Sequence, residues 1–391
     1  MKRKKILIIS AGFLPVPGKI GGVETLITNF IEQNEKIRNF KITLITLEGV
    51  LEEVDYSLCT VIQIHRNKIL RKIVYLGIIL KKLLKMETFE NEYYNYVVRR
   101  KVKKIKNNFD CILIENNIDL LRKLKKELNH NFFYHIHNDD VNKNYSKRYL
   151  RNIQVCFNKI NKVIAVSHYI KRSIEDVIEV NNVVVVNNCI DVRRYSTIYN
   201  NYYVSNYFNI YYIGRLIKEK GIEQLIEAFG YIKNEKVCLK IVGDTTGIFE
   251  NYYKFLLKKV HDGKINCKFL GYVPNDSISQ LFESGNSIVV VPTYSVEEAS
   301  GLVAIEAIAS GVPIIVSDSG ELPFFIPNYA GIIVRRDEAF IENLYYSMLN
   351  LIDKYSFFYN NILINQKKFL KENSLEKYYE NVSQILNANK K

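Results

Sequence analysis

The sequence is poor in the features that mark several common classes of protein. Its six cysteines are scattered and include no Cys-x-x-Cys pair, at positions 59, 111, 156, 189, 238 and 267. This argues against a disulfide framework or a zinc site and fits a reducing cytosol. The uncharged runs fall short of the roughly 18 apolar residues that a transmembrane helix needs. The start, MKRKKILIISAGFLPVPG, has a short apolar run without a small-residue cleavage site, so we interpret it as a buried strand rather than a signal peptide.

Several ligand-binding motifs are also missing. No Gly-x-Gly-x-x-Gly and no Walker sequence occurs, so a nicotinamide-dependent enzyme or an ATPase has no support. No Asp-x-Asp pair occurs, and Asp139 and Asp140 are adjacent rather than spaced to clamp a metal ion. We therefore expect neither a metal nor another cofactor.

Apolar runs alternate with helical patterns along the chain, which predicts α/β domains built on parallel sheets. The strands expected in the first half are residues 5–10, 42–46, 111–115, 132–136, 163–167 and 183–186. Those expected in the second half are residues 210–214, 239–243, 266–271, 287–292 and 312–317. The pattern stops at 193–209, where Asn and Tyr dominate. We therefore predict domains at 1–200 and 201–372, followed by a terminal helix at 373–391 that packs back on the first domain.

The excess of basic over acidic residues is confined to the first half. The formal net charge is +14, and residues 1–200 hold 35 Lys and Arg against 20 Asp and Glu, whereas residues 201–391 hold 20 against 21. A basic half indicates an anionic surface or ligand.

Unusual residues follow the predicted strands, where ligands of such sheets bind. Gly21 and Gly22 come after the first strand and before a helix, which favours an anion site, although a plain tight turn has the same pattern. Arg215 and Lys220 follow the strand at 210–214, and a guanidinium with an ammonium suits a diphosphate. Two surface cations are by themselves more often a solvated face.

The stretch VEEASGLVAIEAIASGVP, residues 296–313, carries two glutamates eight residues apart. Glu298 precedes a predicted helix, and Glu306 can lean back toward its N-terminus. Carboxylates accept hydrogen bonds from sugar hydroxyls. Gly301 leaves room for a ligand, and exposed backbone N–H groups at Ser300, Leu302 and Val303 suit phosphate. A capping glutamate followed by an exposed helical glutamate is the alternative.

These residues carry a resemblance. GRLIKEKGIEQLIEAF, followed by EEASGLVAIEAIASGVPIIVS, resembles the retaining glycosyltransferases of glycosyltransferase family 4. The likeness extends through GGVE, VIAVS, NNCIDVRRY and FLGYVP, and so covers most of the chain. It implies a GT-B fold, in which two Rossmann-like, doubly wound parallel-sheet domains face each other across a cleft. It also implies transfer of a sugar from a nucleotide sugar, expected to be UDP-linked, to a glycan or lipid-linked acceptor in cell-surface polysaccharide synthesis.

The resemblance assigns roles to matching positions. Glu298 would contact the donor sugar as a catalytic residue, and Glu306 would hold the ribose. Arg215 and Lys220 would hold the diphosphate. The remaining donor-binding positions would be Gly21, Gly22, Gly271, Tyr272, Val273, Ser300, Gly301, Leu302 and Val303. His137 resembles the family histidine near the donor sugar, and His135, two residues earlier, is the competing candidate.

Residues 69–86, ILRKIVYLGIILKKLLKM, read as a helix with a basic side and an apolar side. The basic side holds Arg71, Lys81, Lys82 and Lys85, with Lys72 at its edge. The apolar side holds Leu76, Leu80, Leu83 and Leu84. Such a helix lies on anionic lipid, although a helix packed on its own domain has the same pattern. We expect a cytoplasmic protein that sits peripherally on the inner face of the plasma membrane.

Two other readings remain open. A GT-B-fold nucleotide-sugar epimerase also binds its ligand between two such domains, but the Arg/Lys and two-glutamate motifs disfavour it. A basic protein without catalysis, which binds nucleic acid or membrane, is the alternative of another class. Nucleic-acid binding would require basic charge beside exposed aromatic side chains. The aromatic stretch YNNYYVSNYF carries no charge, so we expect no nucleic-acid partner.

Overall fold

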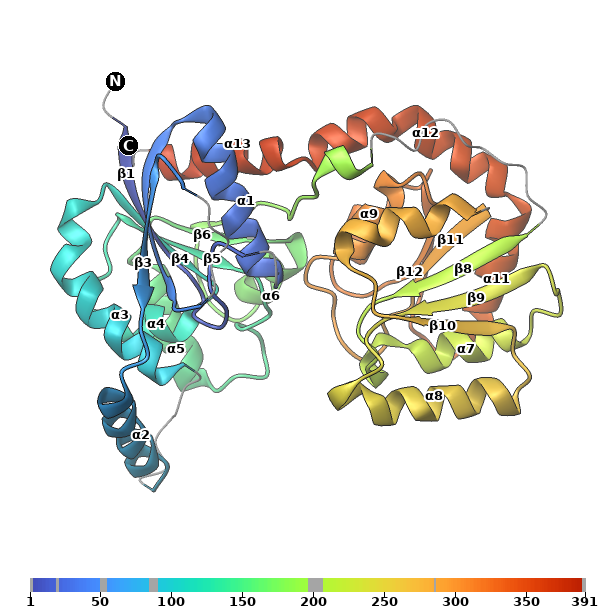
Figure 1. The fold of residues 1–391 in the computed structure, drawn as a ribbon, viewed down its shortest axis with the longest axis horizontal. Coiled ribbons are helices and arrows are strands. Elements are labelled where there is room, and N and C mark those ends of the chain that lie inside the picture. Colours follow the sequence, from blue (N-terminus) through green and yellow to red (C-terminus); the bar gives the residue numbers. More distant parts are fainter. Residues whose placement is uncertain are drawn as a thin grey trace. The chain divides into compact units, whose positions relative to one another are not determined.

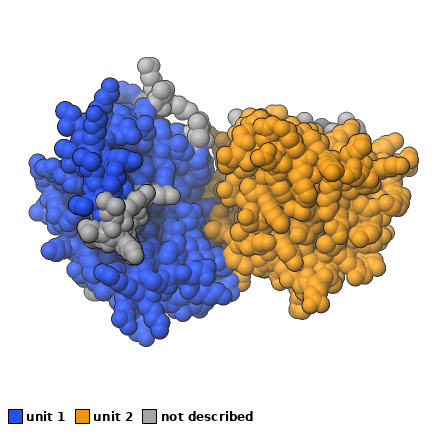
Figure 2. All heavy atoms as spheres, turned by 90° about the horizontal axis from the view of Figure 1, so that it is seen from below, with its two compact units in different colours: residues 1–188, 375–391 blue, residues 189–374 orange. Residues whose placement is uncertain are grey.

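The computed structural model describes residues 3–18, 21–49, 55–83, 91–195, 207–284 and 286–388. The chain divides into two compact units, coloured separately in Figure 2. Unit 1 contains residues 1–188 and 375–391, and unit 2 contains residues 189–374. The expected boundary at 200 falls within residues 196–206, outside the described residues. Both units are α/β with parallel sheets, as the alternating pattern predicts.

Unit 1 is built on a seven-stranded parallel sheet in the order β3-β2-β1-β4-β5-β6-β7. Its strands are β1 (Lys4–Ile9), β2 (Phe40–Leu47), β3 (Cys59–Ile64), β4 (Cys111–Glu115), β5 (Phe132–Ile136), β6 (Lys162–Ala165) and β7 (Val183–Val185). Its α-helices are α1 (Gly22–Ile37), α2 (Lys68–Leu83), α3 (Glu92–Ile105), α4 (Ile118–Lys123), α5 (Lys147–Phe157), α6 (His168–Glu175) and α13 (Leu375–Asn387). Figure 1 shows the arrangement.

Unit 2 is built on a six-stranded parallel sheet in the order β10-β9-β8-β11-β12-β13. Its strands are β8 (Phe208–Ile213), β9 (Val237–Val242), β10 (Cys267–Gly271), β11 (Asn286–Val291), β12 (Ile314–Ser317) and β13 (Gly331–Val334). Its α-helices are α7 (Ile222–Gly230), α8 (Glu250–Asp262), α9 (Leu302–Ala309), α10 (Leu322–Phe325), α11 (Phe340–Asp353) and α12 (Tyr355–Glu372).

The central strands are largely apolar because helices cover both faces of each sheet (Figure 1). In β8, Ile210 and Tyr212 belong to one core cluster, whereas Tyr211 and Ile213 belong to the cluster on the opposite face. Side chains alternate across a strand, so a strand covered on both faces loses the alternation of polar and apolar residues. This is why the central strands are read as continuous apolar runs.

The sequence analysis missed two strands, and each is an edge strand. β3 is at the edge of the first sheet and mixes Thr60 and Gln63 with apolar residues, while β13 is at the edge of the second and has four residues. Edge strands are covered less completely, so they need not form the long apolar runs that mark buried strands. Their burial confirms this: only the two ends of β3 and the last residue of β13 are buried.

The C-terminal helix α13 belongs to unit 1 and packs on α1. The rings of Phe30 and Tyr379 lie with centroids 4.9 Å apart, and Tyr379 also donates a hydrogen bond to Asn34 Oδ1 at 2.9 Å. Asn34 in turn bonds the backbone of Phe40 through both its Oδ1 and its Nδ2 at 3.0 Å. The last helix is therefore held to the first helix and to the start of β2.

Each sheet reverses its direction of strand order at one point. In unit 1 this point lies between β1 and β4, and in unit 2 it lies between β8 and β11. Ligands of open α/β sheets bind outside the carboxyl ends of the strands at such a point. The segments that follow β1, β4, β8 and β11 are therefore the places to look for a site.

Helix α2 projects from the rest of unit 1 (Figure 1). Its side chains at Ile69, Ile73, Tyr75, Leu76 and Leu80 are all exposed, with 65% of Leu76 accessible to solvent. Lys68, Arg71 and Lys72 are exposed as well. The helix also contacts α3, and its residues Leu70, Val74 and Ile78 are partly buried, so the alternative of a helix packed on its own domain stays open. No helix in the described parts of the chain is both long and apolar enough to cross a bilayer.

Candidate active site

The predicted diphosphate-binding lysine and the first glutamate of the two-glutamate motif meet in unit 2. Lys220 closes the short 3-10 helix Lys218–Lys220 that follows β8, and its Nζ forms an ion pair with Glu298 Oε1. The backbone brings them together, because Glu219 O accepts hydrogen bonds from Tyr294 N at 3.0 Å and Ser295 N at 3.1 Å. Residues 78 positions apart in sequence thus form one charged pair.

Two glycines permit this close packing. A Cβ at Gly221 would overlap the carbonyl oxygen of Pro292, and a Cβ at Gly320 would overlap the backbone of Glu298. Both residues also have positive φ, +72° and +52° respectively. Gly320 further donates through its backbone N–H to the Glu297 carboxylate. Gly221, after β8, and Gly320, after β12, therefore let these two segments pack against residues 292–298 because neither glycine has a side chain.

The orientation of Glu298 is held by neutral groups in addition to Lys220. Thr293 Oγ1 donates to Glu298 Oε1 at 2.6 Å, and Glu298 N donates to Ser319 Oγ at 3.1 Å. Glu298 Oε1 thus accepts hydrogen bonds from both Thr293 and Lys220. The ion pair between Lys220 and Glu298 is only partly exposed. A donor sugar at Glu298 would meet a carboxylate that is already oriented.

Arg336 fastens the loop that carries Glu298, and the sequence analysis did not find it. Its guanidinium donates to Glu297 Oε1 at 2.8 Å and to Asp318 Oδ1 at 3.2 Å. It also donates to three carbonyl oxygens, those of Tyr294 (3.2 Å), Val296 (3.3 Å) and Asp318 (3.1 Å). Arg336 follows β13, a strand that was missed, so no sequence pattern directed attention to it.

Helix α9 begins where the motif predicts. Its N-cap Gly301 adopts φ +54° and ψ 36°, a left-handed conformation that suits glycine, and a Cβ there would press on Leu322. The first N–H groups of a helix have no acceptor within it, so those of Leu302 and Val303 are directed outward from the helix N-terminus. Ser300 precedes them and is half-buried. An anion is stabilised at such a terminus.

Glu306 is on α9, one turn further along. Burial raises the pKa of Glu306 to about 7, and the charge of Arg194 offsets only part of this rise. No hydrogen bond to this carboxylate occurs within the part of the chain that the structure describes, and ribose hydroxyls would supply donors.

The other predicted donor residues of unit 2 are more open. Arg215 lies two residues after the end of β8, and its side chain is exposed. Its carbonyl oxygen accepts a hydrogen bond from Tyr212 Oη at 2.8 Å. Gly271 ends β10 with φ +73°, and its carbonyl oxygen accepts from Gly243 N at 2.9 Å. Tyr272 is exposed, and Val273 packs against the core cluster that contains α9.

In unit 1, Gly21 and Gly22 open helix α1 as predicted. Gly21 is the N-cap with φ +89°, and a Cβ there would overlap the Glu24 carboxylate. Gly22 has open space around it, and both glycines are exposed. Residues 19 and 20, which precede them, are outside the described residues.

His137 and His135 share one carboxylate, that of Glu115 at the end of β4. His137 Nε2 and His135 Nδ1 each lie 3.1 Å from Glu115 Oε2. His135 is fully buried and stacks on Tyr378, whereas His137 reaches the carboxyl end of the strand and keeps 7% of its surface exposed. Burial lowers the pKa of His137 to about 4, so its ring is neutral at pH 7. Glu115, which the sequence analysis did not single out, therefore orients the candidate histidine.

The ligand atoms of Glu115, His135 and His137 lie within 4.8 Å of one another, close enough to hold one metal ion. The arrangement fits equally without a metal ion, because His137 Nε2 is hydrogen-bonded to Glu115 Oε2 at 3.1 Å, while the ring nitrogens of His135 have no hydrogen-bond partner among the described residues. The expectation that no metal is needed stays a prediction.

Comparison with known proteins matches both units. The family described as glycosyltransferase family 4 matches residues 20–194, and the family described as glycosyl transferases group 1 matches residues 203–350. The chain belongs to glycosyltransferase family 4.

Curated relatives align with this family 4 chain over limited stretches. An uncharacterized glycosyltransferase of Methanocaldococcus jannaschii is 38% identical over 29% of this chain and 28% of its own length. A capsular polysaccharide biosynthesis glycosyltransferase of Staphylococcus aureus is 33% identical over 34% of this chain and 33% of its own length. The alignments with the first curated relatives cover 21% to 34% of those proteins.

Solved structures show the same fold over the whole chain. A glycosyltransferase from Rickettsia africae superposes with a TM-score of 0.76 at 18% identity, covering 99% of this chain and 98% of that one. HepE from Anabaena, in complex with UDP and glucose, superposes with a TM-score of 0.70 at 19% identity, covering 98% and 99%. These neighbours establish the GT-B fold predicted from the sequence motifs.

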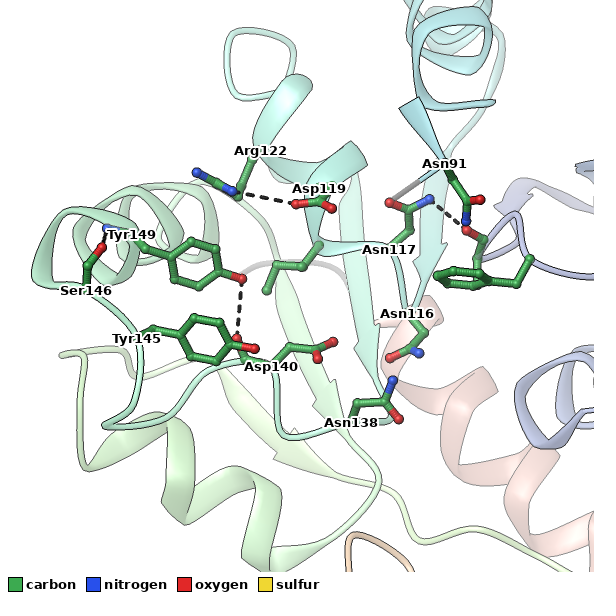
Figure 3. Close-up of a pocket in the computed structure, with 13 residues that line it drawn as sticks. Asn91, Asn116, Asn117, Asp119, Arg122, Asn138, Asp140, Tyr145, Ser146 and Tyr149 are labelled. Carbon is green, nitrogen blue, oxygen red and sulfur yellow. Dashed lines mark hydrogen bonds and ion pairs between the residues drawn. The ribbon is translucent and has the colours of Figure 1, made fainter. Parts of the chain in front are cut away.

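Unit 1 of this family 4 chain also contains a pocket of about 550 Å³ (Figure 3). None of the predicted site residues lines it. It lies past the carboxyl ends of β1, β4 and β5, at the point where the strand order reverses. Its polar lining includes Asn116, Asp119, Arg122, Asn138, Asp140 and Tyr145. The sequence analysis named Asp140 only to dismiss a metal clamp and did not find the others.

Proposed function

We propose that this chain is a retaining hexosyltransferase that moves a sugar from a UDP-linked donor to a glycan or lipid-linked acceptor. The observation that carries the proposal is the pairing of Lys220 with Glu298 after β8 and β11, at the reversal point of the second sheet. An ammonium and an oriented carboxylate beside the N-terminus of α9 match the needs of a diphosphate and a sugar. The likeness to Anabaena HepE, whose structures are complexes with UDP and glucose and with UDP-glucose, favours a uridine nucleotide.

We assign the roles within unit 2 as follows. Arg215 and Lys220 hold the diphosphate and neutralise the charge that develops on it, and the N–H groups of Leu302 and Val303 bind its oxygens. Glu298 accepts from donor-sugar hydroxyls, and Glu306 accepts from the ribose. Gly271, Tyr272 and Val273 line the place of the base, and Ser300 and Gly301 line the place of the phosphates. His137, Gly21 and Gly22 act from unit 1 on the donor sugar.

The proposed reaction retains the configuration at the sugar. The bond between the anomeric carbon and the leaving phosphate oxygen breaks, and the acceptor oxygen bonds to the same face of that carbon. The acceptor proton passes to the departing diphosphate. This step needs no nucleophile from the protein and no metal ion, provided that Arg215, Lys220 and the α9 terminus stabilise the leaving group.

We further propose that α2 holds the protein on an anionic lipid surface, the inner face of the plasma membrane. The helix presents exposed apolar side chains such as Leu76 and Leu80 together with Arg71 and Lys72. The net positive charge of residues 1–200 adds to the attraction. Lys81 and Lys82, and the segment 84–86, have side chains outside the described set. A role in cell-surface polysaccharide synthesis is supported by relatives named for capsule and lipopolysaccharide synthesis.

The proposal is tested by measuring UDP binding and donor turnover together. Purified protein is titrated with UDP by calorimetry and then incubated with a panel of UDP-, GDP- and ADP-sugars, with hydrolysis and transfer followed by release of the nucleotide. We expect UDP to bind and a UDP-sugar to be turned over, with weaker UDP binding in Arg215→Ala and Glu306→Ala, because hydrogen bonds to charged groups contribute about 1.5–3 kcal/mol.

Unchanged UDP affinity in both variants would overturn the site assignment. Release of an epimerised sugar without transfer would favour the epimerase instead. Salt-sensitive binding to RNA without any nucleotide-sugar turnover would favour a non-catalytic nucleic-acid binder.

A further inference from the structure

The pocket in unit 1 has a charge balance that discriminates between possible acceptors. Its charged lining consists of Asp119, Asp140 and Arg122. The single cation among the described lining residues is already engaged, since Arg122 Nη1 lies 3.6 Å from Asp119 Oδ1 and its guanidinium carbon lies 4.6 Å from the ring centre of Tyr149. The pocket therefore has no excess of positive charge to offer a phosphate, and two carboxylates would repel one.

The polar groups of the pocket suit hydroxyls. Burial raises the pKa of Asp119 to about 6, against the opposing effect of Arg122 and Lys123, which indicates a carboxylate short of hydrogen-bond donors. Asn116 accepts from His137 N through Oδ1 at 2.9 Å, and this bond leaves its NH₂ group for a ligand. Carboxylates that accept, next to a carboxamide that donates, match hydroxyl groups, which do both.

The pocket also has an apolar side. The rings of Tyr145 and Tyr149 stack with centroids 4.6 Å apart and an interplanar angle of 18°. Figure 3 shows these two rings lying one over the other on one side of the pocket, with Asn116, Asn117 and Asn138 on the other. Tyr149 is fixed by a hydrogen bond from its Oη to Asp140 O at 3.3 Å, while Tyr145 remains 38% exposed. A ring with one apolar face and hydroxyls at its edge fits between these two sides.

We infer that this pocket binds an uncharged, hydroxyl-rich ring of the acceptor, a glycosyl or polyol group, and discriminates against acceptors that carry a phosphate on that ring. The inference rests on the proposed transferase function and specifies its acceptor class. Asp119 is the specificity-determining residue, because its partly buried carboxylate supplies acceptor oxygens to the lining of the pocket. A lipid-linked acceptor would then place its terminal sugar here and keep its phosphate outside.

The test compares matched neutral and phosphorylated ligands. Binding of the methyl glycosides of glucose, galactose, mannose and N-acetylglucosamine is measured by saturation-transfer NMR with UDP present, beside the corresponding sugar phosphates. We expect at least one methyl glycoside to bind more tightly than its phosphate. Asp119→Asn should weaken that binding about tenfold or more, because it removes a charged acceptor. The matched control Asp176→Asn, at an exposed position on α6's C-terminal end, should leave it unchanged.

UDP affinity, measured on the same samples, distinguishes failure of the transferase proposal from failure of the inference about the acceptor. If UDP fails to bind the wild-type protein, the transferase proposal fails. If UDP binds but no methyl glycoside does, or the sugar phosphates bind as tightly, or Asp119→Asn leaves glycoside binding unchanged, this inference alone is overturned. Should Asp119→Asn not fold, Tyr145→Ala removes an exposed aromatic face instead, and unchanged glycoside binding in that variant counts against the pocket.

Discussion

Glu306 illustrates how one residue can link nucleotide binding to pH. Its pKa is raised to about 7 by burial, so in the unliganded protein its charged and neutral forms coexist near neutral pH. Hydrogen bonds donated by a ribose favour the charged form. If the ribose binds at Glu306 as we propose, nucleotide binding requires a proton to leave Glu306 whenever the pH is below about 7.

We predict that UDP affinity rises between pH 6 and pH 8 in the wild-type protein and that Glu306→Gln binds more weakly with a flatter profile. The nucleotide titrates on its own, so the informative quantity is the difference between wild type and variant, measured by calorimetry at pH 6, 7 and 8. Parallel profiles would mean that Glu306 does not meet the ribose.

Gly320 is a second residue whose effect is local and measurable. We predict that Gly320→Ala lowers both thermal stability and UDP-sugar turnover, since its Cβ would overlap the backbone of Glu298 and its φ is +52°. Gly247→Ala is the matched control, because Gly247 has φ +60° but open space around it. The control should show only the backbone cost, about 1–2 kcal/mol. Equal loss of stability in the two variants would mean that the backbone of Glu298 shifts to make room for the added Cβ at Gly320.

Among the elements of unit 2, the loop between β11 and α9 depends on Arg336, which follows β13. We predict that Arg336→Ala lowers the free energy of unfolding by about 2 kcal/mol and raises the KM for the donor, because the loop loses a charged donor shared by five oxygens. Denaturant unfolding and donor kinetics measure the two effects. Arg336→Lys should recover part of the stability.

The neighbouring Arg335 provides the control for this prediction. It is exposed, and Arg335→Ala makes the same change of charge one residue away. A KM increase of the same size in both variants would show that the effect is a general loss of positive charge and not the release of the Glu298 loop.

Helix α2 is the element with a separable proposed role. We predict that the protein floats with vesicles containing phosphatidylglycerol at low salt and that Arg71→Glu with Lys72→Glu releases it, since each basic residue near such a surface contributes about 1 kcal/mol. The interaction should weaken as salt screens the charges. Hydrolysis of a soluble donor should persist in the variant.

The control for flotation is the same charge reversal on an exposed pair in unit 2, Lys367→Glu with Lys368→Glu on α12. That variant should float like the wild type. Equal release by both variants would assign the attraction to net charge, and failure of the wild type to float would refute the membrane role of α2.

At the scale of the whole molecule, the proposed chemistry relies on fixed cations of the protein. We predict that transfer activity survives incubation with EDTA and that mass spectrometry of the purified protein finds no stoichiometric metal. Glu115 would then act as the hydrogen-bond partner that orients His137. Loss of activity in EDTA that manganese restores, or one bound metal per chain, would contradict the prediction.

The sequence alone predicted the α/β class, the parallel sheets and most central strands. β4 and β5 coincide with the runs CILIE and FFYHI, because strands covered on both faces must be continuously apolar. The motif residues Lys220, Glu298, Gly301 and Glu306 were found because a helix start, a glycine and spaced charges leave local patterns. The comparisons confirm the family and the fold, while the individual roles of these residues stay predictions.

The tertiary structure decided what depends on contacts distant in sequence. Arg336 meets Glu297 across 39 positions, and Glu115 meets His137 across 22, and neither pairing leaves a periodic pattern. The pocket in unit 1 likewise gathers residues that follow three different strands. The amphipathic pattern of residues 69–83 fits either a packed or an exposed helix, and only its placement at the end of unit 1 shows that apolar side chains such as Leu76 and Leu80 face solvent. Periodicity records which side chains of an element share a face, whereas the fold determines what that face meets.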